Sequence, residues 1–206
     1  MTDELWRRGA RQLADDIANK RTTSREVVEA HLARIAEVNP AVNAVVKVLA
    51  DDARRMADAA DRAVNEGRSL GPLHGVPMTI KENIDVAGQA TTHGVPLFAE
   101  AIAPTSSPAV ERMLAAGAIP IGRSNLPDMG LRIHTDSSLH GRTKNPWMSE
   151  RTAGGSSGGE GAALATGMSP IGLGNDIGGS LRNPAHACGI ASIKPSVGVI
   201  PDAQTY

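Results

Sequence analysis

GGSSGGEGAALATGMSPIGLGNDIGGSLRNPAHACGIASIKPS, residues 154–196, contains the densest glycine cluster of the chain and decides how its fold is interpreted. Ten of the 22 glycines lie between positions 154 and 179. Glycine permits left-handed backbone and a close approach of the main chain to a ligand, at a cost in chain entropy. The spacing Ser157-x-x-Glu160 predicts a capping box, and good helix formers follow it. The glycines therefore belong to a tight turn that leads into a helix.

A second tight turn is predicted shortly after this helix. Residues 170–174 are typical of a short strand, and residues 175–180, NDIGGS, predict the turn that follows it. Two turns that carry serines beside a sheet favour nucleophilic chemistry.

Three glycine patterns match other motifs incompletely. Residues 154–159 contain two G-x-S-x-G patterns of the nucleophile elbow, but residues 151–153 are a poor strand end. Residues 117–124, GAIPIGRS, have arginine where a P-loop requires lysine. Residues 172–174 lack the third glycine of a dinucleotide-binding turn. None of these patterns supports a working site.

The first third of the chain predicts helices. The spacing Thr23-x-x-Glu26 is a capping box that opens a helix, and Asn39-Pro40 is expected to end it. Before this helix, apolar residues recur at helical spacing. They are Trp6, Ala10, Leu13 and Ile17.

Strands and helices alternate in the next part of the chain. Residues 44–49 predict a strand, and residues 51–65 predict an amphipathic helix that Gly67 stops. The expected apolar face of this helix carries Ala53, Met56, Ala60 and Val64. Ser107-Pro108 predicts a helix start, and residues 118–122 predict another strand.

A further strand is predicted just before Lys81. Val76, Met78 and Ile80 alternate with other residues, so Lys81 is expected at the end of this strand, on the face opposite the apolar set. The alternation of strands and helices predicts an α/β fold, with helices packed on a central sheet.

The composition excludes several classes of function. The 206 residues carry a formal net charge of −1 and 2% aromatic residues, so we expect no nucleic acid or anionic membrane as partner. A single cysteine, Cys188, excludes an internal disulfide, and the six scattered histidines predict no metal site. We expect no cofactor either. No signal peptide and no apolar run of about 20 residues is visible, so a cytoplasmic protein is expected.

Three segments of the sequence resemble those of a known family. Residues 154–196 are similar to the signature of the amidase-signature family, and HGVPMTIKENIDVAG, residues 74–88, resembles that family's lysine region. HGRTKNPW, residues 140–147, resembles the segment that leads into the signature. The resemblance runs from about residue 72 to the end, and it implies a mixed central sheet covered by helices, preceded by a helical region.

The resemblance also implies a catalytic Ser–Ser–Lys triad. Ser180 matches the nucleophile, Ser156 the bridging serine that the family holds on a cis peptide, and Lys81 the base. The backbone N–H groups of Ile177, Gly178, Gly179 and Ser180 match the oxyanion hole. Asn175 departs from the pattern, because threonine or serine is frequent there, and Leu181 replaces the usual isoleucine. Neither departure falls on the triad.

The chemistry explains these residue types. A serine hydroxyl is a poor nucleophile until a base removes its proton, and lysine can do this only when it is neutral. Burial favours the neutral form, because it penalises the charged one. The expected reaction is therefore hydrolysis of a carboxylic amide to an acid plus ammonia or an amine, through a serine acyl-enzyme.

Two alternatives and one structural expectation accompany this prediction. The chain could instead be the glutaminase subunit of a tRNA-dependent amidotransferase, or a catalytically silent binding protein of the same fold. The predicted partner is a small-molecule amide, and a homodimer is left open. Family members are roughly twice as long, so residues 1–206 are expected to be the N-terminal portion of one domain. Residues 1–70 would form a helical lead-in and residues 72–206 a catalytic core segment. The isolated 206-residue chain is expected to have little or no amidase activity.

Overall fold

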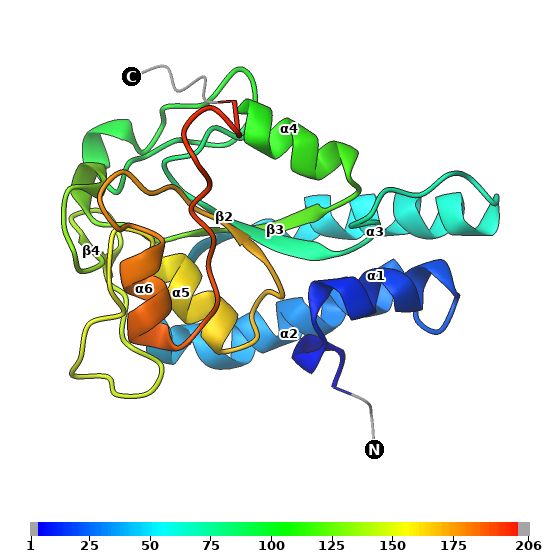
Figure 1. The fold of residues 1–206 in the computed structure, drawn as a ribbon, viewed down its shortest axis with the longest axis horizontal. Coiled ribbons are helices and arrows are strands. Elements are labelled where there is room, and N and C mark those ends of the chain that lie inside the picture. The colour runs from blue at the N-terminus through cyan, green and yellow to red at the C-terminus, as the bar shows by residue number, and fades with distance from the viewer. Residues whose placement is uncertain (1–3, 202–206) are drawn as a thin grey trace.

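A four-stranded sheet runs through the centre of the computed structural model, which describes residues 4–201 (Figure 1). Its strand order is β1-β3-β2-β6. β2 is parallel to both neighbours, whereas β1 is antiparallel to β3, so the sheet is mixed as expected. The strands are β1 (Val45–Val48), β2 (Pro77–Lys81), β3 (Ile119–Ser124) and β6 (Gly172–Leu173).

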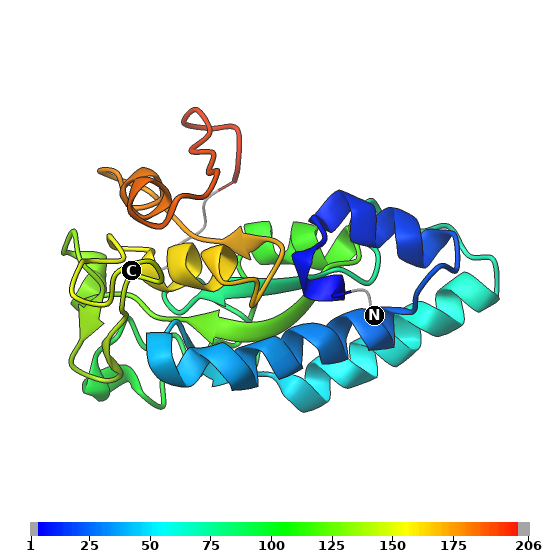
Figure 2. The same cartoon turned by 90° about the horizontal axis from the view of Figure 1, so that it is seen from below.

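Helices cover this sheet. The α-helices are α1 (Ala10–Ala18), α2 (Ser24–Val42), α3 (Ala50–Asn65), α4 (Pro108–Ala115), α5 (Gly158–Ala165) and α6 (Arg182–Cys188). The short elements are η1 (Leu5–Arg7), η2 (Pro96–Phe98), η3 (Asp128–Gly130), and a ribbon of β4 (Asp136–Ser137) with β5 (Gly141–Arg142). Figure 2 shows α2 and α3 along one long side, while α6 and the chain after it project from the other. No helix within residues 4–201 is long and apolar enough to cross a bilayer.

Two apolar layers hold β2 and β3 in place. The first combines α2, α3 and α5 with β1 and β3, and it includes Val28, Ile121 and Ala162. The second lies against α4 and includes Met78 and Ile80 of β2. Burying such side chains stabilises the fold by about 1.5–3 kcal/mol for each large one. Because β2 lies between these two layers, it is buried along its whole length.

The second α-helix begins as the sequence predicts but ends later. The Thr23 side chain accepts from the Glu26 amide, and the Glu26 side chain accepts from the Thr23 amide, which confirms the capping box. The prediction that Asn39-Pro40 ends the helix is wrong, because α2 continues through Pro40 to Val42. Pro40 lies in the last turn, where its missing N–H removes one helical hydrogen bond. The helix ends instead at Asn43, which has a left-handed φ of 56°.

The predicted capping box of α5 is wrong. Ser157 is the residue before the helix, but its side chain makes no capping bond. Its hydroxyl donates to the Asn175 carbonyl at 3.4 Å instead. The Glu160 side chain turns into the protein, where Thr79 and Ser124 donate to it. Tertiary hydrogen bonds therefore replace the local pattern at this helix start.

Three smaller differences concern element boundaries. The first apolar repeat is divided between η1 and α1, and the predicted strand at 170–174 shortens to β6. The buried residues of α3 are Ala53, Ala57 and Ala63, whereas Met56 is 36% exposed. The apolar face of α3 is therefore rotated from the predicted one.

Candidate active site

Lys81 ends β2 with its side chain fully buried, on the face opposite Met78 and Ile80 as the alternation predicts. An irregularity in the β2–β3 register, between Met78 and Thr79, pairs Lys81 with Ser124. The Lys81 Nζ lies 2.7 Å from Ser156 Oγ and 2.6 Å from Asn175 Oδ1. The structure therefore places Lys81 and Ser156 in direct contact.

Burial changes the acidity of the Lys81 amine. Desolvation lowers the pKa of Lys81 from its usual value to about 7, although the negative charges of Glu160 and Asp176 oppose this shift. Desolvation likewise raises the pKa of the buried Glu160 carboxyl, against the hydrogen bonds from Ser124 and Thr79. Lys81 can therefore lose its proton near neutral pH, as a base must.

Ser156 lies in a turn that the surrounding backbone encloses. The peptide bond between Gly155 and Ser156 is cis, and Ser156 is 3% exposed. A Cβ placed on Gly155 would lie 2.6 Å from the Arg132 carbonyl oxygen and 2.7 Å from the His134 amide nitrogen. Only glycine leaves this backbone room to approach, so the packing fixes the position of the Ser156 hydroxyl.

Ser180 lies beside this turn on a second turn, between β6 and α6. The Ser157 amide donates to the Ser180 carbonyl oxygen at 3.1 Å, which ties the two turns together. The Ser180 side chain is half-buried, and within residues 4–201 its hydroxyl makes no hydrogen bond. The structure thus places Ser180 next to the Ser156 turn by its backbone.

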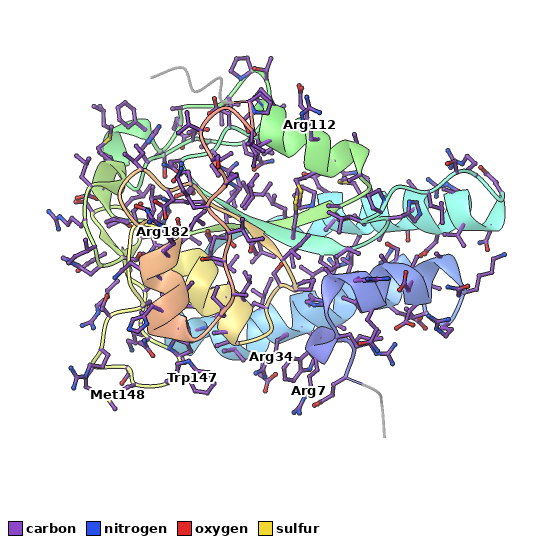
Figure 3. All side chains as sticks on the ribbon, in the orientation of Figure 1. Arg7, Arg34, Arg112, Trp147, Met148 and Arg182 are labelled. Carbon is purple, nitrogen blue, oxygen red and sulfur yellow. The ribbon has the colours of Figure 1, made fainter. Side chains whose placement is uncertain are left out.

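Asp176 braces the second turn. Its carboxylate accepts from the Gly179 amide at 2.7 Å and from the Leu181 amide at 3.0 Å. Arg182, at the start of α6 (Figure 3), donates to both of its oxygens. These bonds, that from Arg182 above all, hold the pKa of Asp176 well below its usual range. Asp176 and Arg182 therefore organise the turn and are not an isolated surface pair.

The backbone amides of this turn differ in availability. Gly179 donates to Asp176, as described above. The amides of Ile177, Gly178 and Ser180 donate to no group within the described part of the chain. A Cβ on Gly178 or Gly179 would meet nothing within 4 Å. Three N–H groups of this turn are therefore free, and its two glycines, Gly178 and Gly179, have open space beside them.

A cavity of about 290 Å³ lies at the start of the second turn, although neither Lys81 nor Ser156 nor residues 177–180 belong to its wall. Asn83, Asn175 and Asp176 belong to its wall, together with residues 194–198. Asn175 reaches from this wall to Lys81, and its Nδ2 donates to Asn83 Oδ1 at 3.2 Å. No group of three or more His, Cys, Asp or Glu side chains between residues 4 and 201 is placed to hold a metal ion.

Two residues of the site were not predicted from the sequence as part of it. Asn175 was noted only as a departure from the family pattern, yet it contacts Lys81 directly. Glu160 was assigned to a helix cap, yet it lies buried near Lys81. Glu160 is the only charged residue of the α5 sequence GGEGAALA, and a lone charge in such an apolar helix is the signal that could have revealed it.

Comparisons with known proteins identify the family of the chain. A sequence profile described as Amidase matches residues 26–206. An indoleacetamide hydrolase from Bradyrhizobium diazoefficiens is 49% identical over 96% of this chain and 38% of its own length. A glutamyl-tRNA(Gln) amidotransferase subunit from Synechococcus sp. strain WH7803 is 41% identical over 89% of this chain and 38% of its own length.

Solved structures give the same answer. A bacterial aryl acylamidase of the amidase-signature enzymes superimposes with a TM-score of 0.84 at 34% identity, over 86% of this chain and 37% of that protein. The fold and the two serine turns thus define an amidase-type α/β protein, and the chain belongs to the amidase-signature family. It spans well under half the length of these relatives.

Proposed function

We propose that this chain carries the Ser180–Ser156–Lys81 triad of an amidase that hydrolyses carboxylic amides. The single observation that carries the proposal is the contact of the buried Lys81 amine with Ser156 Oγ, at 2.7 Å. Ser156 lies in the turn that is hydrogen-bonded to the backbone of Ser180. Among residues 4–201 no carboxylate forms an ion pair with the Lys81 amine, and burial favours the neutral form that a base requires.

The proposed reaction begins with a proton relay. Neutral Lys81 takes the proton of Ser156, and Ser156 takes the proton of Ser180 as the Ser180 oxygen attacks the amide carbonyl carbon. The C–N bond then breaks, and the leaving nitrogen receives a proton from Ser156, which Lys81 replaces. Water attacks the acyl-enzyme by the same route, which releases the acid and restores Ser180.

The oxyanion of the tetrahedral intermediate requires donors that already point at it. Among the four predicted N–H groups, those of Ile177, Gly178 and Ser180 are free to donate. We assign the oxyanion hole to these three amides in preference to that of Gly179, because the Gly179 amide already donates to Asp176. Loss of one such donor typically costs about 3 kcal/mol of transition-state stabilisation.

Labelling of the full-length protein with a serine-directed phosphonate probe tests the proposal. We expect Ser180→Ala to abolish labelling and to reduce amide turnover by at least roughly a thousandfold, because no other hydroxyl replaces the nucleophile. Ser169→Ala is a matched control, because Ser169 is buried and donates to the Ile171 carbonyl, outside the two turns. A folded Ser180→Ala protein that is labelled like the wild type would falsify the assignment.

A second candidate is the glutaminase subunit of a tRNA-dependent amidotransferase. It is favoured by the 41% identity to the glutamyl-tRNA(Gln) amidotransferase subunit from Synechococcus. The same triad would then release ammonia from glutamine and require a second protein as partner. Ammonia release from glutamine, with such a protein retained during purification, distinguishes this candidate from a free-standing amidase.

The proposal includes the remaining expectations about the protein. We propose a small-molecule amide as substrate, a cytoplasmic location and a single domain in which residues 1–206 form the N-terminal portion. Turnover across aliphatic, aromatic, peptide and urea-type amides identifies the substrate class. Cell fractionation tests the location, and light scattering of the purified protein tests for a homodimer.

A further inference from the structure

Asn175 lies between the candidate base and the cavity. Its Oδ1 is 2.6 Å from Lys81 Nζ, and its Nδ2 donates to Asn83 Oδ1 at 3.2 Å. Both Asn83 and Asn175 belong to the cavity wall. The Lys81 ammonium can only donate, so the oxygen of the Asn175 amide faces it, and the amide nitrogen is then the donor to Asn83 Oδ1.

The Asn175 oxygen restricts how the neutral Lys81 amine can be oriented. A neutral amine has two N–H bonds and one lone pair, and a base must direct the lone pair at the proton it takes. An amide oxygen can only accept, so Asn175 Oδ1 binds an N–H of Lys81 and cannot occupy the lone pair. The lone pair is then free for the other close neighbour, Ser156 Oγ at 2.7 Å.

The same contact stabilises the charged amine after proton transfer. Lys81 is fully buried, so the ammonium formed during the reaction has no contact with bulk water. A carbonyl oxygen at 2.6 Å provides a charge-assisted hydrogen bond at that moment. Asn175 therefore acts on both states of Lys81 without adding a charge of its own.

We propose that Asn175 is the positioning residue of Lys81, which directs the Lys81 lone pair at Ser156 and stabilises the amine once it is protonated. This inference rests on the proposed function, in which Lys81 is the base. Asn175 lines the cavity as well, so a ligand that displaced the Asn83 contact would also disturb the base.

The charged groups around Lys81 come from several elements, and Asn175 is not one of them. Glu160 of α5 and Asp176 of the second turn favour the charged amine, while burial disfavours it. The Arg123 guanidinium of β3 donates to the Lys81 carbonyl at 3.4 Å. His93, whose pKa burial lowers, also interacts with the Lys81 charge.

The pH dependence of phosphonate labelling of the full-length protein tests the proposal. The wild-type rate constant is expected to rise with pH through the pKa of Lys81, because the neutral amine is the active form. Asn175→Asp places a carboxylate beside Lys81, so we expect the midpoint to move up by about one to three pH units. Asn175→Leu removes the acceptor at similar size, so we expect a midpoint below the wild type and a plateau lowered roughly tenfold.

A second variant and a separate control complete the test. Asn83→Leu removes the partner of the Asn175 amide. We expect it to lower the pH midpoint of labelling, as Asn175→Leu does, but by less. Unchanged midpoints in Asn175→Asp and Asn175→Leu, with Lys81→Ala unlabelled, would overturn the positioning role alone. Full labelling of Lys81→Ala would instead overturn the proposed function. Thermal unfolding of each variant identifies any that does not fold, and Asn83→Leu then decides the outcome.

Discussion

In the turn that carries Ser156 the glycines are enclosed by backbone, whereas in the turn that carries Ser180 they face open space. A Cβ on Gly159, at the start of α5 directly after this turn, would overlap the Asn125 backbone and lie 2.9 Å from the Ala44 carbonyl oxygen. A Cβ on Gly178 would meet nothing within 4 Å. The same residue type thus permits close packing in the first turn and an open approach in the second.

This difference separates two requirements of the site. The first turn places the Ser156 hydroxyl against Lys81 within the protein, where the surrounding chain fixes both groups. The second turn leaves three backbone amides without partners among the described residues, on the side from which a ligand can approach. In the proposed function, rigid packing would support proton transfer, and open backbone would support binding of a developing charge.

Removal of the Ser156 hydroxyl should have the largest effect among the changes that test this comparison. We expect Ser156→Ala to lower the labelling rate by about a hundred- to ten-thousandfold, because Lys81 then has no hydroxyl through which to act. Ser157→Ala is the matched control, since its hydroxyl contacts only the Asn175 carbonyl at 3.4 Å. Equal losses in the two variants would show that the turn, and not the Ser156 hydroxyl, matters.

Alanine substitutions at the packed start of α5 and in the open second turn should separate stability from activity. Gly159→Ala forces a methyl group into the Asn125 backbone, and we expect a loss of about 1–3 kcal/mol in the free energy of unfolding. That loss lowers the Tm by about 2–4 °C per kcal/mol for a chain of this size. Gly178→Ala should keep the wild-type Tm but slow labelling, because its methyl group enters the ligand side. Calorimetry together with probe labelling checks both, and a stable Gly159→Ala would refute the packing argument.

The brace of the second turn predicts a smaller effect. Asp176→Ala removes the acceptor for the Gly179 and Leu181 amides, so the free N–H groups lose their fixed direction. We expect the labelling rate to fall roughly tenfold, a fraction of the loss for an oxyanion donor itself. Arg182→Gln leaves the bonds between Asp176 and these amides in place, so it should lower the labelling rate less than Asp176→Ala does. A larger loss in Arg182→Gln than in Asp176→Ala would show that the ion pair carries the effect.

The smallest expected effect concerns the stability cost of the base. The pKa of Lys81 in the folded protein, about 7, lies below its usual 10.5, so the unfolded chain binds more protons between these values. Wild-type stability should therefore rise with pH across this window, and Lys81→Met should lack that rise. We expect the variant to have a higher Tm than the wild type at pH 7, with the difference fading toward pH 10. Thermal unfolding at pH 7, 8.5 and 10 checks this, and a constant difference would contradict it.

The sequence predicted the local features of the fold better than the contacts between distant segments. The same S/T-x-x-E spacing occurs at Thr23 and at Ser157, and it forms a capping box only at Thr23. The carboxylate of Glu26 stays at the surface, whereas that of Glu160 meets Thr79, which is 81 residues away. A local pattern contains no information about such a partner.

In the site, too, local features were predicted better than contacts between distant segments. The alternation of β2 correctly predicted that Lys81 ends a strand opposite the apolar set, and the resemblance supplied Ser156 as its neighbour. The role of Asn175 could not be predicted, because it depends on a contact with Lys81 across 94 residues. Tertiary packing also allowed α2 to continue through Pro40, which local preferences alone disfavour.

The distances along the chain between Lys81 and its partners have a consequence for how the protein folds. Ser156 and Asn175 follow Lys81 by 75 and 94 residues, so both contacts close long loops. Contacts of such sequence separation form slowly, because the loop entropy is lost before the contact is gained. During synthesis Lys81 emerges well before either partner, and its ammonium group stays hydrated until the glycine turns arrive. We therefore expect the Lys81 amine to be among the last groups of the core to leave water.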